Sequence, residues 1–269
     1  MQQIESSGAY WYNALLVGLN KRFRHGLQFQ VSYTFTRDLS TDAFTTSGAN
    51  GGQSVGNQDD PKQRYGPEYF IRPQRFITNF TYQLPGPKNS HSFKGQALGG
   101  WMVAGVVTFQ SGHPLTLTYN HFAGKPSVFG SGVADRPSLS GTCTNGHYLN
   151  SGSAQSNIGG TKTYINTSCF TDPAVFSADD PNGVGFGNAG VGILDSPGQR
   201  NFDLSLIKRF PVGWPRESAV MEFRSEFFNA FNHPQFGDPD TEFTSTTFGQ
   251  ITTTVVNPRV LQFALKYSF

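Results

Sequence analysis

Residues 261–269, LQFALKYSF, alternate strictly between large apolar or aromatic residues and small or polar ones. This period of two predicts a β-strand whose two faces meet different surroundings. Residues near a chain terminus that are not docked in a sheet usually fray and tend to be polar. We therefore expect this segment to pair in a sheet, and its large residues to share one face: Leu261, Phe263, Leu265, Tyr267 and Phe269.

The same alternation recurs in six earlier segments. The clearest places Leu27, Phe29, Val31, Tyr33 and Phe35 opposite glutamines, serine and threonines. The apolar sides of all six segments lie within residues 15–23, 27–35, 76–84, 101–109, 202–210 and 221–227. The stretch Arg24-His25-Gly26 predicts a tight turn between the first two, and no helix of useful length is predicted. The sequence therefore indicates an all-β protein of about seven antiparallel strands.

Composition narrows the class further. Charged residues make up 14% of the chain, against roughly 25% in an average soluble domain, while aromatic residues also make up 14%. The net charge is only +2 and the basic residues are scattered along the chain. A nucleic-acid partner is therefore not expected, because such proteins carry a clustered basic surface.

The connections between the predicted strands alternate in length. Three are short: a turn of about three residues, residues 85–98 and residues 211–218. Three are long: residues 37–74, 111–199 and 229–259. Long loops at one edge of a sheet and compact turns at the other are typical of an outer-membrane β-barrel, with short periplasmic turns and long extracellular loops. The fold prediction is thus a segment of an antiparallel transmembrane barrel.

The positions of the charged and aromatic residues are compatible with lipid contacting the apolar face. The charges assigned to that face are Lys21 and Lys208, each close to a strand-ending aromatic residue at the short-turn edge, where we expect a lysine to reach the headgroups. Aromatic residues gather at both strand ends, as expected for interfacial girdles. The alternative is a soluble β-sandwich whose aromatic face packs on a second sheet, because it would give the same alternation.

Few residues suggest a disulfide, a metal site or a catalytic site. Cys143 and Cys169 are the only cysteines, and they form either one disulfide or two free thiols. The six histidines show no ligand spacing. The acidic residues Asp59, Asp60, Asp179, Asp180, Asp238 and Asp240 suit either calcium binding through loop oxygens or, more simply, turn formation. We expect no metal, no cofactor and no catalytic residues, so the chain is not predicted to be an enzyme.

Five stretches resemble TonB-dependent outer-membrane receptors, especially the acidobacterial type. They are WYNALLVGLNKRFRHGLQFQVSYTFTRDLS from Trp11, LGGWMVAGVVTFQSGHPLTL from Leu98, PGQRNFDLSLIKRF from Pro197, EFRSEFFNAFNHPQFG from Glu222 and PRVLQFALKYSF from Pro258. In that family the terminal aromatic strand is the signal that the barrel assembly machinery reads. The resemblance gives that role to Phe263, Leu265, Tyr267 and Phe269.

The chain also departs from that family. Its members are plugged barrels of 22 strands, preceded by a plug domain and a short segment that contacts TonB. About seven strands are predicted here. The resemblance therefore implies that residues 1–269 form a single domain, the C-terminal portion of a larger barrel, read from an internal or wrongly assigned Met1.

The resemblance implies a function in the bacterial outer membrane. It is TonB-dependent uptake of a scarce nutrient of the siderophore, oligosaccharide or peptide class, with barrel strands and ligand-facing loops supplied by this chain. The implied partners are outer-membrane lipid, the TonB complex through the missing N-terminal parts, the barrel assembly machinery and an unknown small-molecule ligand. Two alternatives stay open: a passive porin or structural barrel, and a soluble carbohydrate-binding β-sandwich.

Overall fold

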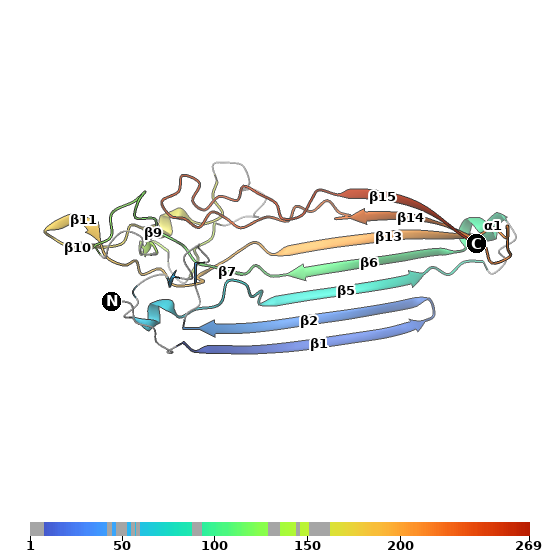
Figure 1. Ribbon diagram of the computed structural model, residues 1–269, viewed down its shortest axis with the longest axis horizontal. Coiled ribbons are helices and arrows are strands. Elements are labelled where there is room, and N and C mark those ends of the chain that lie inside the picture. The colour runs from blue at the N-terminus through green and yellow to red at the C-terminus, as the bar shows by residue number, and fades with distance from the viewer. Residues whose placement is uncertain are drawn as a thin grey trace.

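Seven long strands form one antiparallel sheet in the computed structural model, with their order in the sheet following the chain (Figure 1). The structure describes residues 8–41, 45–46, 53–54, 57, 60–87, 93–128, 135–143, 146–150 and 162–269. The strands are β1 (Tyr10–Arg24), β2 (Leu27–Ser40), β5 (Gln74–Gln83), β6 (Trp101–Gln110), β13 (Gln199–Pro211), β14 (Val220–Phe228) and β15 (Val260–Ser268). The predicted all-β antiparallel architecture is confirmed.

The pairing register brings the seven apolar sets onto a single face. One register row joins Leu19, Val31, Thr78, Val107 and Phe202 across five strands. The row beside it, on the opposite face, joins Asn20, Gln30, Asn79, Val106 and Asp203. Because successive residues of a strand point to opposite faces, one face is apolar and the other mainly polar. We call them the apolar face and the polar face.

No second layer covers the apolar face of β15 in the described part of the chain. Phe263 is 63% exposed and Leu265 is 66% exposed. A β-sandwich requires a second sheet packed about 10 Å away. The sandwich alternative is therefore not supported by the structure.

The short connections and the long ones lie at opposite ends of the strands. The first connection is a two-residue turn in which His25 and Gly26 both have positive φ, 53° and 78°, as a type I′ hairpin requires. Helix α1 (Phe93–Leu98) lies in the second short connection, between β5 and β6, at the same end as the C-terminus (Figure 1). The sequence did not predict this helix, because six residues are too few to show a helical period.

Helix α1 changes the predicted role of Lys208. Instead of reaching toward headgroups, Lys208 is buried at 2% exposure. Its Nζ donates hydrogen bonds to the carbonyl oxygens of Gln96, Ala97 and Gly99 and lies 5.1 Å from the ring centre of Trp101. The last carbonyls of a helix lack partners inside the helix, so this lysine satisfies them. The expected snorkelling of Lys208 is therefore wrong, and the lysine instead ties α1 to the sheet.

Replacing Lys208 by methionine is expected to lower the free energy of unfolding by about 1–2 kcal/mol, because the α1 carbonyls would lose their donor. The measurement is urea unfolding of the protein in lipid vesicles. Lys21→Met is the matched control, since Lys21 is on the same face near the same end, and we expect it to change stability by less than about 0.5 kcal/mol. A Lys208→Met protein as stable as the parent would mean that desolvation of the ammonium cancels its hydrogen bonds.

The strands extend beyond their predicted ends, and this corrects the count of charges on the apolar face. Strand β2 continues to Ser40 and β13 begins at Gln199. Arg37 and Arg200 therefore lie on the apolar face near the loop end. Arg24, after a register shift in β1, pairs with Leu27 at the turn. Within the paired registers every charge on the apolar face is cationic and lies near a strand end.

The sheet is open, with β1 and β15 as its edges. Short elements occur in the long connections, and some pair segments far apart in sequence, as β7 does with β12. No helix in the described ranges has the length and hydropathy to cross a membrane. The short elements are β3 (Thr45–Thr46), β4 (Gln53–Ser54), β7 (Pro114–Leu115), β8 (Ser138–Leu139), β9 (Phe170–Thr171), β10 (Val175–Ser177), β11 (Asp180–Val184), β12 (Leu194–Asp195) and the 3-10 helices Pro61–Arg64 and Thr167–Cys169.

Candidate functional site

The long connections fold together at one end of the sheet (Figure 1). We call the described residues of 111–198 and 229–259 the loop cap. The cap has its own apolar core, in which residues of the first segment surround Phe248 of the second. The loop of residues 60–73 contacts the cap. Gly66 lies so close to Val191 that a Cβ added at Gly66 would be 2.7 Å from the Val191 carbonyl oxygen. The core residues are Leu115, Leu117, Ile165, Cys169, Phe170, Leu194 and Phe248.

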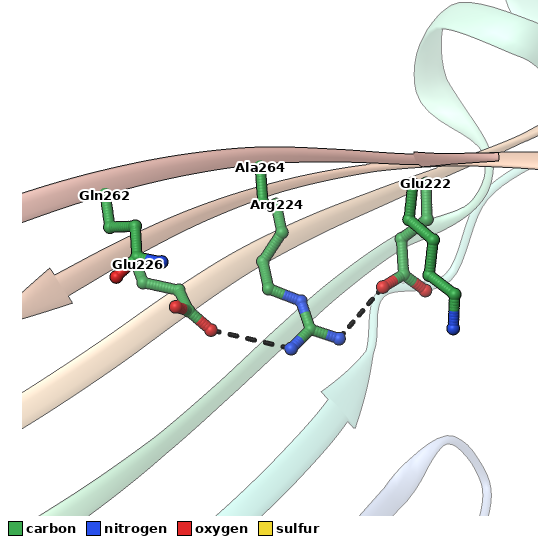
Figure 2. A pocket seen from close by; sticks show the side chains of 6 residues that line it. Glu222, Arg224, Glu226, Gln262 and Ala264 are labelled. Carbon is green, nitrogen blue, oxygen red and sulfur yellow. Dashed lines mark hydrogen bonds and ion pairs between the residues drawn. The ribbon is translucent and has the colours of Figure 1, made fainter.

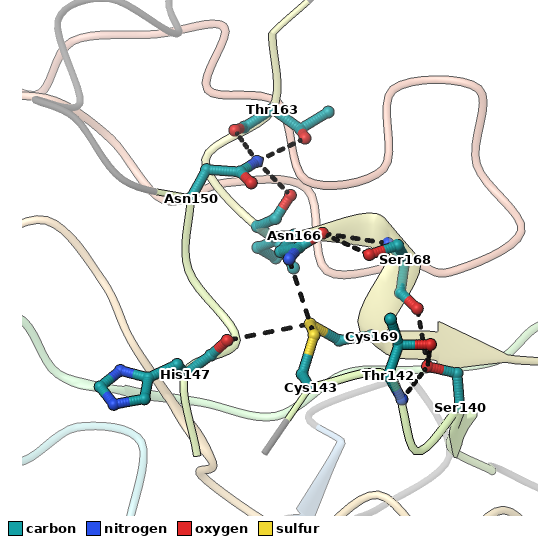
Figure 3. The surroundings of a disulfide bond; sticks show 10 residues. Ser140, Thr142, Cys143, His147, Asn150, Thr163, Asn166, Ser168 and Cys169 are labelled. Atoms are coloured by element: carbon teal, nitrogen blue, oxygen red, sulfur yellow. Dashed lines mark hydrogen bonds between the residues drawn. A yellow bond between two sulfur atoms is a disulfide. The ribbon is translucent and has the colours of Figure 1, made fainter. Parts of the chain in front are cut away.

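The two cysteines meet beside this core. Cys143 and Cys169 form a disulfide, with their Cα atoms 5.2 Å apart (Figure 3). The Asn166 side-chain amide lies 3.6 Å from Cys143 Sγ, and its backbone N–H donates to the Tyr148 carbonyl oxygen at 2.8 Å. Since Cys169 is 1% exposed and belongs to the core, the bond ties the partly buried Cys143, which packs against this core, to the centre of the cap.

A buried polar cluster holds another part of the cap. Asp135, 1% exposed, lies 3.2 Å from His121 and accepts a hydrogen bond from the Gly187 N–H. Burial raises the pKa of the Asp135 carboxyl, although its backbone hydrogen bonds and His121 oppose the shift. The Tyr119 hydroxyl donates to Asp172 at 3.0 Å and accepts from the Lys125 N–H at 2.8 Å. These contacts fix the shape of the cap without using apolar surface.

The polar face carries a row of paired charges on β14 (Figure 2). Arg224 contacts Glu222 at 2.9 Å and Glu226 at 3.5 Å, and Arg209 of β13 contacts Glu222 at 2.8 Å. Together with Gln262, Ala264 and Lys266 of β15, the row lines a groove of about 320 Å³. The alternation of glutamate and arginine along one strand face makes this surface hydrophilic without a large net charge.

A second hollow, of about 300 Å³, lies where β14 enters the cap. Asn229 is 4% exposed and donates through Nδ2 to the His233 carbonyl oxygen at 3.0 Å. Asn232 accepts a hydrogen bond from the Arg259 N–H at 2.9 Å. These bonds orient amide groups around a space that could take a polar molecule. The lining residues are Asn229, Asn232, Pro234, Thr254, Val256, Asn257 and Pro258.

A comparison with protein families decides the class of this sheet. The model of the outer membrane beta barrel domain matches residues 1–262. The chain belongs to this family. No curated protein and no solved structure matches the chain. The protein is therefore an outer-membrane β-barrel protein and its location is the bacterial outer membrane.

Membership of the barrel family assigns the two faces. The apolar face meets lipid and the polar face lines the lumen, because barrel strands alternate apolar-out and polar-in. The long loops of such barrels are extracellular, so the loop cap lies outside the cell. Aromatic rings gather at this end on the lipid face, where Phe76, Phe109, Phe202 and Phe231 follow one another with ring centres 4.9–6.1 Å apart. The row of charges in Figure 2 belongs to the lumen of the barrel.

The sequence candidates for metal binding do not converge. In the described part of the chain no three histidine, cysteine or acidic side chains come together to hold a metal ion. Asp60 caps a 3-10 helix through the Lys62 N–H, Asp240 accepts from the Glu242 N–H, and Asp238 contacts His113 at 3.2 Å. These acidic residues stabilise turns and loops. His91 and Asp59 lie outside the described residues.

The residues proposed as an assembly signal belong to the last strand of the barrel wall, which ends on the periplasmic side. Phe263, Leu265 and Tyr267 are on the lipid face of the edge strand β15, and Phe269 follows the strand. Their recognition by the assembly machinery remains a prediction. The asparagine-lined hollow could not be predicted from the sequence. Its residues come from two segments, 229–234 and 254–258, which share no motif.

The cap is expected to lose stability in alkali. Burial raises the pKa of Tyr119 to about 12 from 10.0. Because an acid whose folded pKa is raised favours the protonated folded state, its contribution is complete below pH 10 and is lost as the pH rises toward 12. Near-UV circular dichroism of the cap should decline over this range, and the decline should be smaller in Tyr119→Phe. Burial raises the pKa of Tyr164 to about 12 as well, so part of the decline should remain. An unchanged profile in Tyr119→Phe would contradict the assignment.

Proposed function

We propose that the protein takes up a scarce nutrient across the outer membrane in a TonB-dependent manner. This chain then supplies part of the barrel wall and the ligand-facing loop cap. The five stretches that resemble TonB-dependent receptors support the proposal, since they span residues 11–269. The proposal gives the chain no catalytic role.

The direction of the two edge strands is the observation that carries the proposal. Each neighbouring pair in the seven-stranded sheet is antiparallel, so β1 and β15 run in the same direction. Direct pairing of these edges, within one chain or between two copies, would be parallel. An antiparallel barrel instead needs an odd number of further strands between them. Unpaired edge groups in lipid cost several kcal/mol each, so we infer that the complete barrel has more strands than these seven. The plugged barrel of 22 strands that the resemblance implies satisfies this parity.

The chemistry of the cap favours a polar ligand. The asparagine-lined hollow places Asn232 and Asn257 next to two prolines and a valine, while the Asn229 amide is used by bonds to His233 and Asn257. Such a mixture of a few oriented polar groups and apolar wall is typical of small-molecule sites. We propose an oligosaccharide, a peptide or an iron chelate as the ligand class, bound at the cap and released to the periplasm when TonB acts on the plug.

The test is uptake of a labelled ligand panel by cells that carry the full-length protein. The panel contains ferric chelates, oligosaccharides and short peptides. We expect uptake of one class, and its loss when TonB is deleted or a protonophore collapses the proton gradient. Asn257→Ala in the hollow should reduce that uptake, while Asn13→Ala on the lipid face should not.

A passive porin or structural barrel gives a different result. Uptake that continues without TonB and without a proton gradient would overturn the proposed mechanism in favour of passive diffusion. Uptake of no panel member, together with no ion conductance in planar bilayers, would favour a structural barrel.

A further inference from the structure

A third hollow lies at the extracellular end of the sheet, apart from both polar surfaces described above. Most of its lining belongs to the lipid face, and Gln110 and Gln199 of the lumenal face complete it at the strand ends. Its volume is about 260 Å³. Its floor is a single register row in which Tyr33, Phe76, Phe109 and Arg200 pair across four strands. Side chains in one register row point to the same face of a sheet. The hollow therefore combines three aromatic rings with one guanidinium on the surface that meets lipid.

Arg200 is held in place through its backbone while its side chain remains available. Its N–H donates to Gln235 Oε1 at 2.7 Å, and Gln235 is 1% exposed. Its guanidinium is exposed and makes no hydrogen bond or ion pair with the described residues. A surface arginine needs no partner in water, but this one lies where the wall meets headgroups. A cation there attracts the anionic groups of the adjacent leaflet.

The charge pattern of the lipid face supports an anionic partner. In the paired registers this face has no carboxylate, and its two charges near the extracellular end are Arg37 and Arg200. The lumenal face, by contrast, carries both signs, as the Glu222, Arg224 and Glu226 row shows. In the paired strands the acidic groups are thus confined to the side that water or other protein reaches. A phosphate-bearing headgroup complements the extracellular rim of the lipid face.

We propose that this hollow binds a lipid of the outer leaflet through its phosphate-bearing headgroup. The fork of N–H donors on Arg200 pairs with phosphate oxygens, a geometry in which arginine binds phosphate with two parallel hydrogen bonds. The Gln74 side chain, on the same face and in the lining, contacts the polar part of the headgroup. The rings of Phe76 and Phe109, 6.1 Å apart, support the first carbons of an acyl chain.

The test measures lipid binding to the full-length protein in a neutral detergent by native mass spectrometry. The probes are diphosphorylated lipid A and the same lipid after enzymatic removal of its phosphates. We expect the protein to prefer the phosphorylated probe, and Arg200→Gln to lower the affinity for that probe by about tenfold. Binding of the dephosphorylated probe should not change in this variant.

Arg75→Gln is the matched control. Arg75 precedes Phe76 of the register row, so it lies at the extracellular end of the sheet as Arg200 does and carries the same charge. Its side chain is on the lumenal face, where Arg75 pairs with Gln110. It should bind both probes as the parent does, and near-UV circular dichroism should show that both variants are folded. Equal loss in Arg75→Gln, equal binding of the two probes, or no loss in Arg200→Gln would overturn the proposal. Displacement of the lipid by an equal concentration of inorganic phosphate would also overturn it, because the site would then recognise a free anion.

Discussion

An arginine in place of Thr78 is expected to lower the free energy of unfolding in a lipid bilayer by about 2–4 kcal/mol. Thr78 lies in the middle of β5 on the lipid face, where it pairs with Val31 and Val107. A charge at mid-depth loses its hydration and finds no carboxylate on this face. The measurement is urea unfolding of the protein reconstituted in vesicles, which gives the free energy from the midpoint and slope of the transition.

Two further arginines on the same strand provide the controls. Gln74→Arg lies on the lipid face at the extracellular end and should cost about 0–1 kcal/mol, because charges near the interface are tolerated. Asn79→Arg lies on the lumenal face beside Gln30 and Val106 and should cost less than about 0.5 kcal/mol. Equal losses at positions 78 and 79, or no loss at position 78, would contradict the assignment of the apolar face to lipid.

The strands could be predicted from the sequence because contact with lipid requires an apolar residue at every second position. An apolar residue is required on one face and not on the other, so β2 and β15 reveal their period directly. Even β6, whose second face has Met102, Ala104 and Val106, presents its predicted apolar side on the apolar face of the sheet. The lengths of the connections then gave the two ends of the barrel, since turn length and loop length differ so strongly.

The ends of the strands were predicted less well. Arg37 and Arg200 were assigned to loops or left out of the apolar sets, because a charge breaks the apolar alternation. The structure instead continues β2 and β13 through them. A cation at a strand end is compatible with the lipid face, since it reaches the headgroup region. The hollow around Arg200 therefore could not be predicted from the apolar alternation, because Arg200 lies beyond the point at which that alternation ends.

The loop cap could not be derived from local sequence. Its core joins Leu117, Ile165 and Phe248, which are far apart in the chain, and its strands are only two to five residues long. Segments this short show no period, and their pairing depends on tertiary contacts. The contact of Lys208 with α1 has the same origin, because it joins residues 109 to 112 positions apart.

Removing the disulfide is expected to lower the stability of the loop cap by about 3–4 kcal/mol, because the Cys143–Cys169 bond closes a loop of 26 residues in the unfolded cap. The double variant Cys143→Ser, Cys169→Ser tests this with hydrogen exchange. Amides of the cap core, such as the Ile165 N–H that bonds to the Gly249 carbonyl, should exchange roughly 100-fold faster or more. Amides in the middle of β13 should keep their protection, since the sheet does not depend on the cap for its backbone pairing.

Reduction of the unmodified protein separates the covalent bond from the packing of the serine side chains. If loop closure is the source of stability, dithiothreitol should accelerate exchange in the cap to the same extent as the double variant, and reoxidation should restore protection. Faster exchange in the variant but not in the reduced protein would instead assign the loss to the polar side chain introduced by Cys169→Ser, because Cys169 is 1% exposed and packs in the cap core. Because the cap carries the asparagine-lined hollow, the same reduction should weaken ligand uptake, and reoxidation should restore it.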